Sequence, residues 1–116
     1  MAARYWVGGN ANWDGTAGTK WATTSGGAGG AAVPTSADDV FLDNGAGTGN
    51  VTITASATCK ALDCTGYVNT LAGSSALQVN GSIIVVAGMT LSYTGTITVN
   101  ATSTITSNGQ TFPGSF

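Results

Sequence analysis

The side chains best suited to chemistry lie in one short acidic segment, SADDVFLDN. It places Asp38, Asp39 and Asp43 close together in the chain, and carboxylate oxygens are the ligands that Ca²⁺ prefers in proteins. The segment has neither the glutamate nor the fixed acidic spacing of an EF-hand loop. Aspartate side chains also accept hydrogen bonds from nearby backbone and so form turns that start strands. We predict that these three residues shape a turn and hold no metal, with weak calcium binding as the alternative.

The two cysteines, Cys59 and Cys64, are a second candidate for chemistry. A structural zinc site takes four Cys or His ligands, whereas the chain has two cysteines and no histidine. An intramolecular zinc site is therefore disfavoured. A disulfide would need a tight bend between the two residues, and free cysteine is among the residue types most often buried. We predict buried, reduced thiols, with a disulfide as the alternative.

Catalytic groups are scarce in this composition. The chain contains no histidine and no glutamate, which limits general acid–base catalysis and removes the residue that usually activates a serine nucleophile. Asp14 and Asp63 stand far from other acids in the sequence, which gives no pair of glycosidase carboxylates. The glycine runs at 26–30 and 45–49 precede neither a helix nor the lysine of a phosphate-binding loop, and they predict flexible surface turns. We expect a protein that is not an enzyme and uses no cofactor.

Four aromatic residues near the start of the chain have two possible roles. They are Tyr5, Trp6, Trp13 and Trp21. As core aromatics they would bury a large apolar area, with their indole N–H groups hydrogen-bonded at the rim. As a platform they would stack on sugar rings, giving a glycan-binding surface. We favour burial, because only 7% of the residues are charged and three exposed indoles would add a large apolar patch.

The composition limits the elements that could position these residues. A chain of 116 residues fits one domain, and its polar positions are filled by Thr, Ser and Asn, which suit strands and turns. The prediction is an all-β fold. A net charge of −2 without a Lys/Arg cluster disfavours nucleic-acid and membrane-surface partners. The longest apolar run, at 82–89, is too short to span a bilayer, and nothing at the N-terminus resembles a secretory signal.

Repeated segments in the second half of the chain favour a particular all-β architecture. VTITAS, LQVNGS and ITVNAT begin at Val51, Leu77 and Ile97, and LDCTG at Leu62 matches LSYTG at Leu91. Such a repeat, with alternation inside each unit, is typical of stacked coils in a parallel β-solenoid. An antiparallel β-sandwich or jelly roll is the alternative, because its strands alternate in the same way. We assign 1–49 to an aromatic, glycine-rich cap and 50–116 to the coils of one domain.

Stacking these segments predicts which side chains meet. The polar ladder would consist of Thr54, Asn80 and Asn100, each bonding to the next coil. Alternation sends one set of apolar side chains inward and leaves a second set on another face. The first set is Val51, Ile53, Leu77, Val79, Ile97 and Val99, and the second is Leu62, Cys64, Leu91 and Tyr93. Because the first coil of a solenoid has no neighbour beneath it, we expect the aromatic residues to close that end.

The order of these motifs resembles the opening module of β-solenoid proteins in phage virions and bacterial surface adhesins. The resemblance lies in YWVGGNANWDGTAGTKW, VPTSADDVFLDN and NVTITASATCKALDCTG, over roughly the first two thirds of the chain. The matching positions are Trp6, Gly8, Gly9, Trp13, Asp14, Trp21, Pro34, Asp38, Asp39, Val40, Val51, Ile53 and Leu62. The resemblance implies a structural or attachment role.

The lack of an export signal and the short repeat favour a phage particle component over an adhesin. We expect a virion protein assembled in the host cytoplasm, acting in a fibre, tail or capsid accessory structure. Its partners would be copies of itself or other virion proteins, and Phe112 and Phe116 are candidate contacts at the open end of the last coil. A carbohydrate-binding module of a cell-surface protein is the alternative.

Overall fold

The structure, a computed structural model, describes residues 2–99 and 103–113, and within them every regular element is a β-strand. Short β-branched segments such as Val51-Thr52-Ile53 alternate inward and outward side chains, which suits a half-buried strand. The strands are β1 (Ala3–Trp6), β2 (Ala11–Trp13), β3 (Trp21–Ala22), β4 (Asp39–Phe41), β5 (Val51–Ile53), β6 (Ala57–Cys59), β7 (Leu62–Asp63), β8 (Thr70–Gly73), β9 (Leu77–Val79), β10 (Ile83–Ile84), β11 (Thr90–Leu91), β12 (Ile97–Val99) and β13 (Ile105–Thr106).

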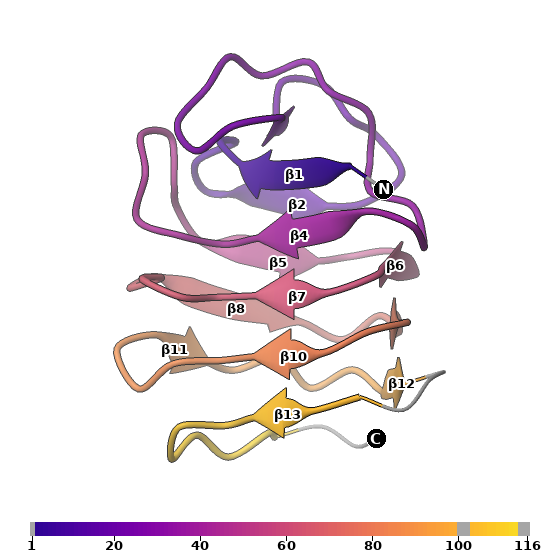
Figure 1. Ribbon diagram of the computed structural model, residues 1–116, viewed down its shortest axis with the longest axis vertical. Helices are drawn as coiled ribbons and strands as arrows, with labels where there is room; N and C mark the ends of the chain where they lie inside the picture. Colours follow the sequence, from indigo (N-terminus) through magenta and orange to yellow (C-terminus); the bar gives the residue numbers. More distant parts are fainter. Residues whose placement is uncertain (1, 100–102, 114–116) are drawn as a thin grey trace.

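The strands wind into a parallel β-solenoid of about three turns, in which each coil lies on the one before (Figure 1). Three sheets form its sides, in the strand orders β13-β10-β7-β4-β1-β3, β11-β8-β5-β2 and β12-β9-β6. Every strand pair is parallel except β1 with β3. The predicted all-β solenoid is confirmed, and the antiparallel sandwich is wrong for this chain.

The core is a set of columns that run along the stack. On the first sheet Val40 pairs with Leu62 and Leu62 with Ile83, and all three side chains are buried. Corners between strands use short polar turns: after β7 the Asp63 carboxylate accepts a hydrogen bond from the Thr65 backbone N–H at 2.9 Å. This side-chain turn ends the strand and redirects the chain toward the next face.

The register of the repeats differs in part from the sequence alignment. Leu77 pairs with Ile97 as predicted, but Val51 pairs with Leu71, and Leu77 pairs on its other side with Ala57. The VTITAS and LQVNGS match was therefore wrong. The physical reason is that β5 and β6 belong to the same coil and are separated by one short corner, so the alternating pattern of LQVNGS fits either strand.

The second internal match was also wrong. Leu62 pairs with Ile83 on one sheet, whereas Leu91 pairs with Leu71 on another. Cys64 and Tyr93 are both buried, but they follow strands on different faces and do not occupy equivalent places.

The ladder of Thr54, Asn80 and Asn100 does not form. Thr54 follows β5 and Asn80 follows β9, on a different sheet, and Asn100 lies outside the described residues. A different ladder takes its place at the corner before the second sheet. The Asn10 side-chain oxygen accepts a hydrogen bond from the Asn50 backbone N–H at 2.8 Å, and the Asn50 side-chain oxygen accepts one from Thr70 at 3.0 Å.

Coil stacking begins before residue 50. β4 pairs with both β1 and β7, and β2 pairs with β5, so two coils draw strands from the region assigned to the cap. The boundary at residue 49 falls inside the coil formed by β4, β5 and β6. Among the residues that the structure describes, no helix has the length and apolar character needed to cross a bilayer.

Candidate functional site: the two ends of the coil stack

Three tryptophans fill the N-terminal end of the stack. Trp6, Trp13 and Trp21 are each no more than 1% exposed. The Trp21 ring meets the other two edge to face, with centroid distances of 5.0 Å to Trp6 and 5.2 Å to Trp13. This geometry is favoured for aromatic pairs. The indoles therefore contact one another inside the first coil, and none is available in this structure to stack on a sugar.

Only one of these indoles has the hydrogen bond expected at the rim. The Trp6 Nε1–H donates to the Gly9 carbonyl oxygen at 2.8 Å. Within the described residues the Nε1 atoms of Trp13 and Trp21 are buried and have no hydrogen-bond partner. The expectation that all three indoles would be satisfied was wrong, because no described polar atom is placed to accept a hydrogen bond from the Trp13 and Trp21 Nε1 atoms.

Tyr5 does not belong to this cluster. It precedes Trp6 on the same strand, and adjacent residues of a strand point to opposite faces. Because Trp6 points inward, Tyr5 lies on the outer face, where its ring stacks on Phe41 with a centroid distance of 4.6 Å and an interplanar angle of 15°. The prediction of Tyr5 as a core aromatic is corrected to an outward, partly exposed residue, and Phe41 is the partner that the sequence analysis missed.

A long connection holds the indoles in place. Between β2 and β4 the chain crosses the end of the stack, and β3 pairs antiparallel with β1, matching Trp21 to Trp6 (Figure 1). The Val7 backbone N–H donates to the Lys20 carbonyl oxygen at 2.8 Å, and the Lys20 side chain forms an ion pair with Asp14 at 3.0 Å. The antiparallel strand covers the edge of β1 that would otherwise be open.

The acidic segment shapes turns. The Asp38 carboxylate accepts hydrogen bonds from the backbone N–H and the hydroxyl of Thr35, at 2.9 and 3.1 Å. The Thr35 backbone N–H is the main cause of a lowered Asp38 pKa. Asp43 accepts from the Gly45 N–H at 3.0 Å and from the Ser25 hydroxyl at 2.7 Å, while Asp39 begins β4. In the described residues no three acidic, cysteine or histidine side chains gather as they would around a metal.

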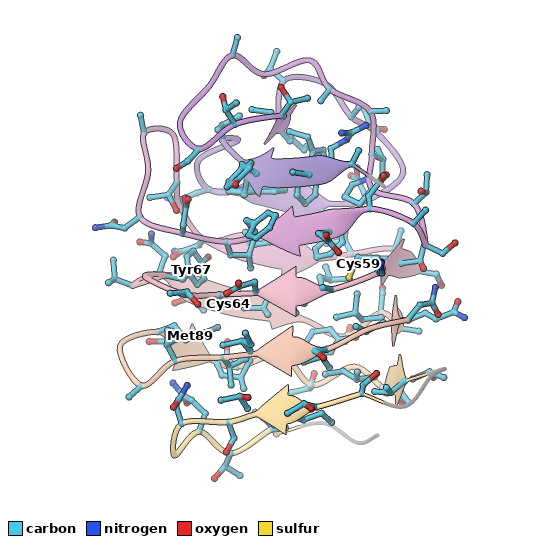
Figure 2. All side chains as sticks on the ribbon, in the orientation of Figure 1. Cys59, Cys64, Tyr67 and Met89 are labelled. Atoms are coloured by element: carbon cyan, nitrogen blue, oxygen red, sulfur yellow. The ribbon has the colours of Figure 1, made fainter. Side chains whose placement is uncertain are left out.

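Both cysteines are free thiols in the core (Figure 2). Burial raises the pKa of Cys59 to about 12, and Asp39 adds a smaller effect of the same sign. Burial also raises the pKa of Cys64. Tyr67, near Cys64 in the core, is fully buried, and its hydroxyl donates a hydrogen bond to the Gly49 carbonyl oxygen at 2.6 Å. These groups pack the interior and hold their protons.

The two glycine runs were expected to be surface turns, and they do lie in turns and bends with exposed residues, but Gly26 and Gly45 also bring the two loops into close contact. A Cβ added to Gly26 would lie 3.0 Å from the Ala46 backbone nitrogen, and one added to Gly45 would lie 2.5 Å from the Ser25 hydroxyl oxygen. The loops of the cap and of the second coil therefore meet where only small residues fit.

The C-terminal end of the stack is built differently. β11, β12 and β13 are the last strands of their sheets, so each is paired on one side. Ile105 occupies the column of Val40, Leu62 and Ile83, which are at most 2% exposed, but Ile105 itself is 41% exposed. Phe112 packs partly buried against the core, and Phe116 lies outside the described residues. Sequence analysis did not single out Ile105. It lies about one coil length after Ile83 in the sequence, and that spacing was a usable signal.

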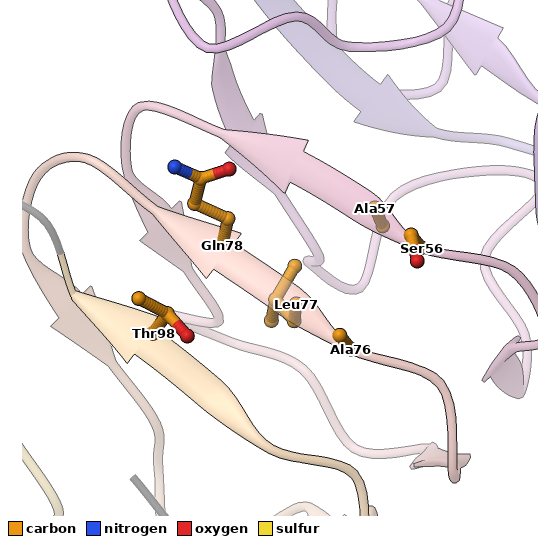
Figure 3. A pocket seen from close by; sticks show the side chains of 6 residues that line it. All are labelled: Ser56, Ala57, Ala76, Leu77, Gln78 and Thr98. Atoms are coloured by element: carbon orange, nitrogen blue, oxygen red, sulfur yellow. The ribbon is translucent and has the colours of Figure 1, made fainter.

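A shallow groove follows the third sheet (Figure 3). It has a volume of about 340 Å³ and is lined by neutral side chains from β6, β9, β12 and the corners before β6 and β9. These residues are Ser56, Ala57, Ala76, Leu77, Gln78 and Thr98. The groove offers hydrogen-bond donors and acceptors but no charge.

Fold and ends together define the chain as a short parallel β-solenoid that is closed by aromatic residues at one end. No protein-family model, curated protein or solved structure matches the chain.

Proposed function

We propose that this chain is a non-enzymatic structural protein of a phage particle, acting as a fibre, tail or capsid accessory component. The observation that carries the proposal is the difference between the two ends of the stack. One end is sealed by three buried indoles and an antiparallel strand, and at the other end β12 and β13 are the last strands of their sheets. A coil stack with one available end is suited to docking through that end.

The use of the acidic side chains supports a structural role. Asp14, Asp38, Asp43 and Asp63 each accept a hydrogen bond from a backbone N–H in a turn. Carboxylates engaged in this way fix the corners of the coils. These aspartate side chains therefore have a structural role in the turns.

The proposed partners are copies of the same chain or other virion proteins. The proposed location is the virion, with assembly in the host cytoplasm. The resemblance of the aromatic first module to those of phage β-solenoid proteins supports this choice. Nucleic acid and membranes are not proposed as partners, because the net charge is −2 and the three basic residues are dispersed.

Mass spectrometry of purified virus particles from the producing cells tests this function. We expect peptides of this chain at a fixed copy number per particle, and antibody labelling at one location on the particle. A chain that is abundant in the lysate but missing from purified particles would overturn the proposal.

A glycan-binding module of a surface protein is the second candidate, favoured by the neutral groove of Figure 3. Sugar hydroxyls would bond to Gln78 and Thr98, which are exposed. Titration with neutral oligosaccharides, followed by NMR, should then shift the Gln78 side-chain amide and leave the buried indole signals unchanged. A Gln78→Ala variant should weaken that binding, and an unshifted Gln78 amide across a glycan panel would remove this candidate.

A further inference from the structure

We infer that the C-terminal end of the stack docks against the same end of a second copy, which gives a two-fold, tail-to-tail dimer. This inference deepens the proposed function, because it rests on self-assembly and names the surface and the symmetry. Its central residue is Ile105, and its edges are β12 and β13.

The packing at this end is incomplete in the single chain. Val40, Leu62 and Ile83 are buried because a coil lies on either side of each of them. Ile105 continues their column and keeps 41% of its surface exposed. A second copy placed over it would complete the column in the way that a further coil does elsewhere in the stack.

Among the residues that the structure describes, β12 and β13 each have a strand partner on one edge only. Soluble proteins guard such edges with charged side chains, proline or a covering segment. All three basic and five acidic residues of this chain lie between Arg4 and Asp63, and no charged side chain follows Asp63. The β12 and β13 edges therefore carry neutral side chains, and no described strand pairs with their outer sides.

The distribution of charge also selects the orientation. Each copy has a net charge of −2, and all the charged side chains lie in residues 4–63 of the sequence. A tail-to-tail arrangement keeps these charged regions of the two copies apart. A head-to-tail arrangement would instead press the open edges onto β3 and the long connection that already cover the other end.

The size of the end face is consistent with a weak but specific dimer. The stack measures 32 × 26 × 22 Å, and its long axis runs along the column of coils (Figure 1). A copy docked on a face of the two shorter dimensions would bury roughly 1,000 Å² in total, near the lower limit for a specific interface. Strand edges related by a two-fold axis run antiparallel, so backbone hydrogen bonds can form across the interface.

The test is the oligomeric state of the full chain over a range of concentrations. Sedimentation velocity from roughly 1 to 100 μM should show a monomer that converts to a dimer, since an interface of this size gives micromolar affinity. Because the interface is uncharged, added salt should not weaken the dimer. A species that stays monomeric over the whole range overturns the inference.

Matched substitutions locate the interface. Ile105→Lys brings two lysines together across the two-fold axis and should raise the dimer dissociation constant at least tenfold. Val68→Lys is the control, because Val68 is the other large apolar residue with high exposure among those described, at 55%, and lies between β7 and β8. It should leave the dimer unchanged. Dimerisation that survives Ile105→Lys, or is lost equally with Val68→Lys, overturns the inference.

Hydrogen exchange of the unmodified chain provides a readout that does not depend on variant folding. The β12 and β13 amides should become more protected as concentration rises, while the β5 amides should not change. Uniform behaviour of the two regions would contradict docking at this end. Particle incorporation is measured separately, so a monomeric chain found in virions would refute the dimer and leave the proposed function standing.

Discussion

The aromatic cap gives a sharp prediction from two chemically identical substitutions. Trp6→Phe and Trp21→Phe each remove one pyrrole ring from a side chain that is 1% exposed or less. The packing cost of the smaller ring is therefore similar at the two positions. The hydrogen bonding differs, because the Trp6 Nε1–H donates to the Gly9 carbonyl oxygen and the Trp21 Nε1 has no partner.

The expected difference follows from the energetics of buried donors. Loss of the bond to Gly9 should cost about 1 kcal/mol, whereas removal of an unpaired buried N–H should recover about 1 kcal/mol or more of its desolvation penalty. Trp6→Phe should therefore be about 2 kcal/mol less stable than Trp21→Phe. For a chain of this length that difference corresponds to a gap of roughly 8 °C between the two melting temperatures.

Urea unfolding followed by far-ultraviolet circular dichroism measures this difference without relying on the fluorescence that the substitutions alter. Trp13→Phe is the matched control, since the Trp13 Nε1 also has no partner, and it should behave like Trp21→Phe. Equal losses at Trp6 and Trp21 would mean that ring faces satisfy the buried indole N–H groups. The reasoning from unpaired donors would then be wrong.

Three further predictions concern the coils. Gly73→Ala should lower the free energy of unfolding by about 3 kcal/mol or more, and Gly66→Ala by about 1 kcal/mol. Both glycines have positive φ, but only at Gly73 would an added Cβ clash with the Ile53 carbonyl oxygen, 2.3 Å away. The urea midpoints of the two variants provide the comparison. The contribution of Cys59 to the free energy of unfolding should fall by up to about 1.4 kcal/mol per pH unit between pH 9.0 and about 12, because burial raises the pKa of Cys59 to about 12 and the unfolded chain loses this proton first. Burial raises the pKa of Cys64 as well, so the Cys59 contribution is measured as the difference in slope between the unmodified chain and Cys59→Ala. Below pH 9.0 this contribution is constant, and a Cys59→Ala variant whose slope equals that of the unmodified chain would contradict the assignment. Asn50→Ala should lower the free energy of unfolding by about 1 kcal/mol, because the Thr70 backbone N–H of the next coil loses its acceptor. Asn50→Asp keeps an acceptor and should cost less. Thermal melts of the two variants distinguish the outcomes.

The sequence contained enough information for the fold but not for its register. The segments that begin at Leu77 and Ile97 both alternate regularly and are separated by one coil, so the pairing of these two segments was predicted correctly. Val51 and Ala57 lie in the same coil, and both begin alternating strands. Similarity between segments does not say which side of a coil each one occupies, because every face imposes the same inward and outward pattern.

The first coil shows why the polar ladder was missed. Asn10 and Asn50 occupy equivalent corners, but the connection that carries Trp21 separates them by twice the usual spacing. A search for a constant repeat length does not find such a pair. Tyr5 could have been placed correctly, since two adjacent strand residues cannot both point inward and Trp6 has the larger apolar ring.

The two ends of the coil stack share one physical problem, because a terminal coil has no neighbour to cover its apolar side chains and strand edges. Each coil is covered by its neighbours, so the first and the last coil each lack one. At the N-terminal end a long connection supplies Trp21, and two buried indole N–H groups without partners show that filling the space outweighed hydrogen bonding there. At the other end Ile105 is left exposed in the part of the chain after Asp63, which carries no charged side chain. A single exposed apolar side chain is common on soluble proteins, and an uncharged strand edge does not lead to association when another segment covers it. Their coincidence at one end, opposite a sealed end, is the observation on which the proposed dimer rests.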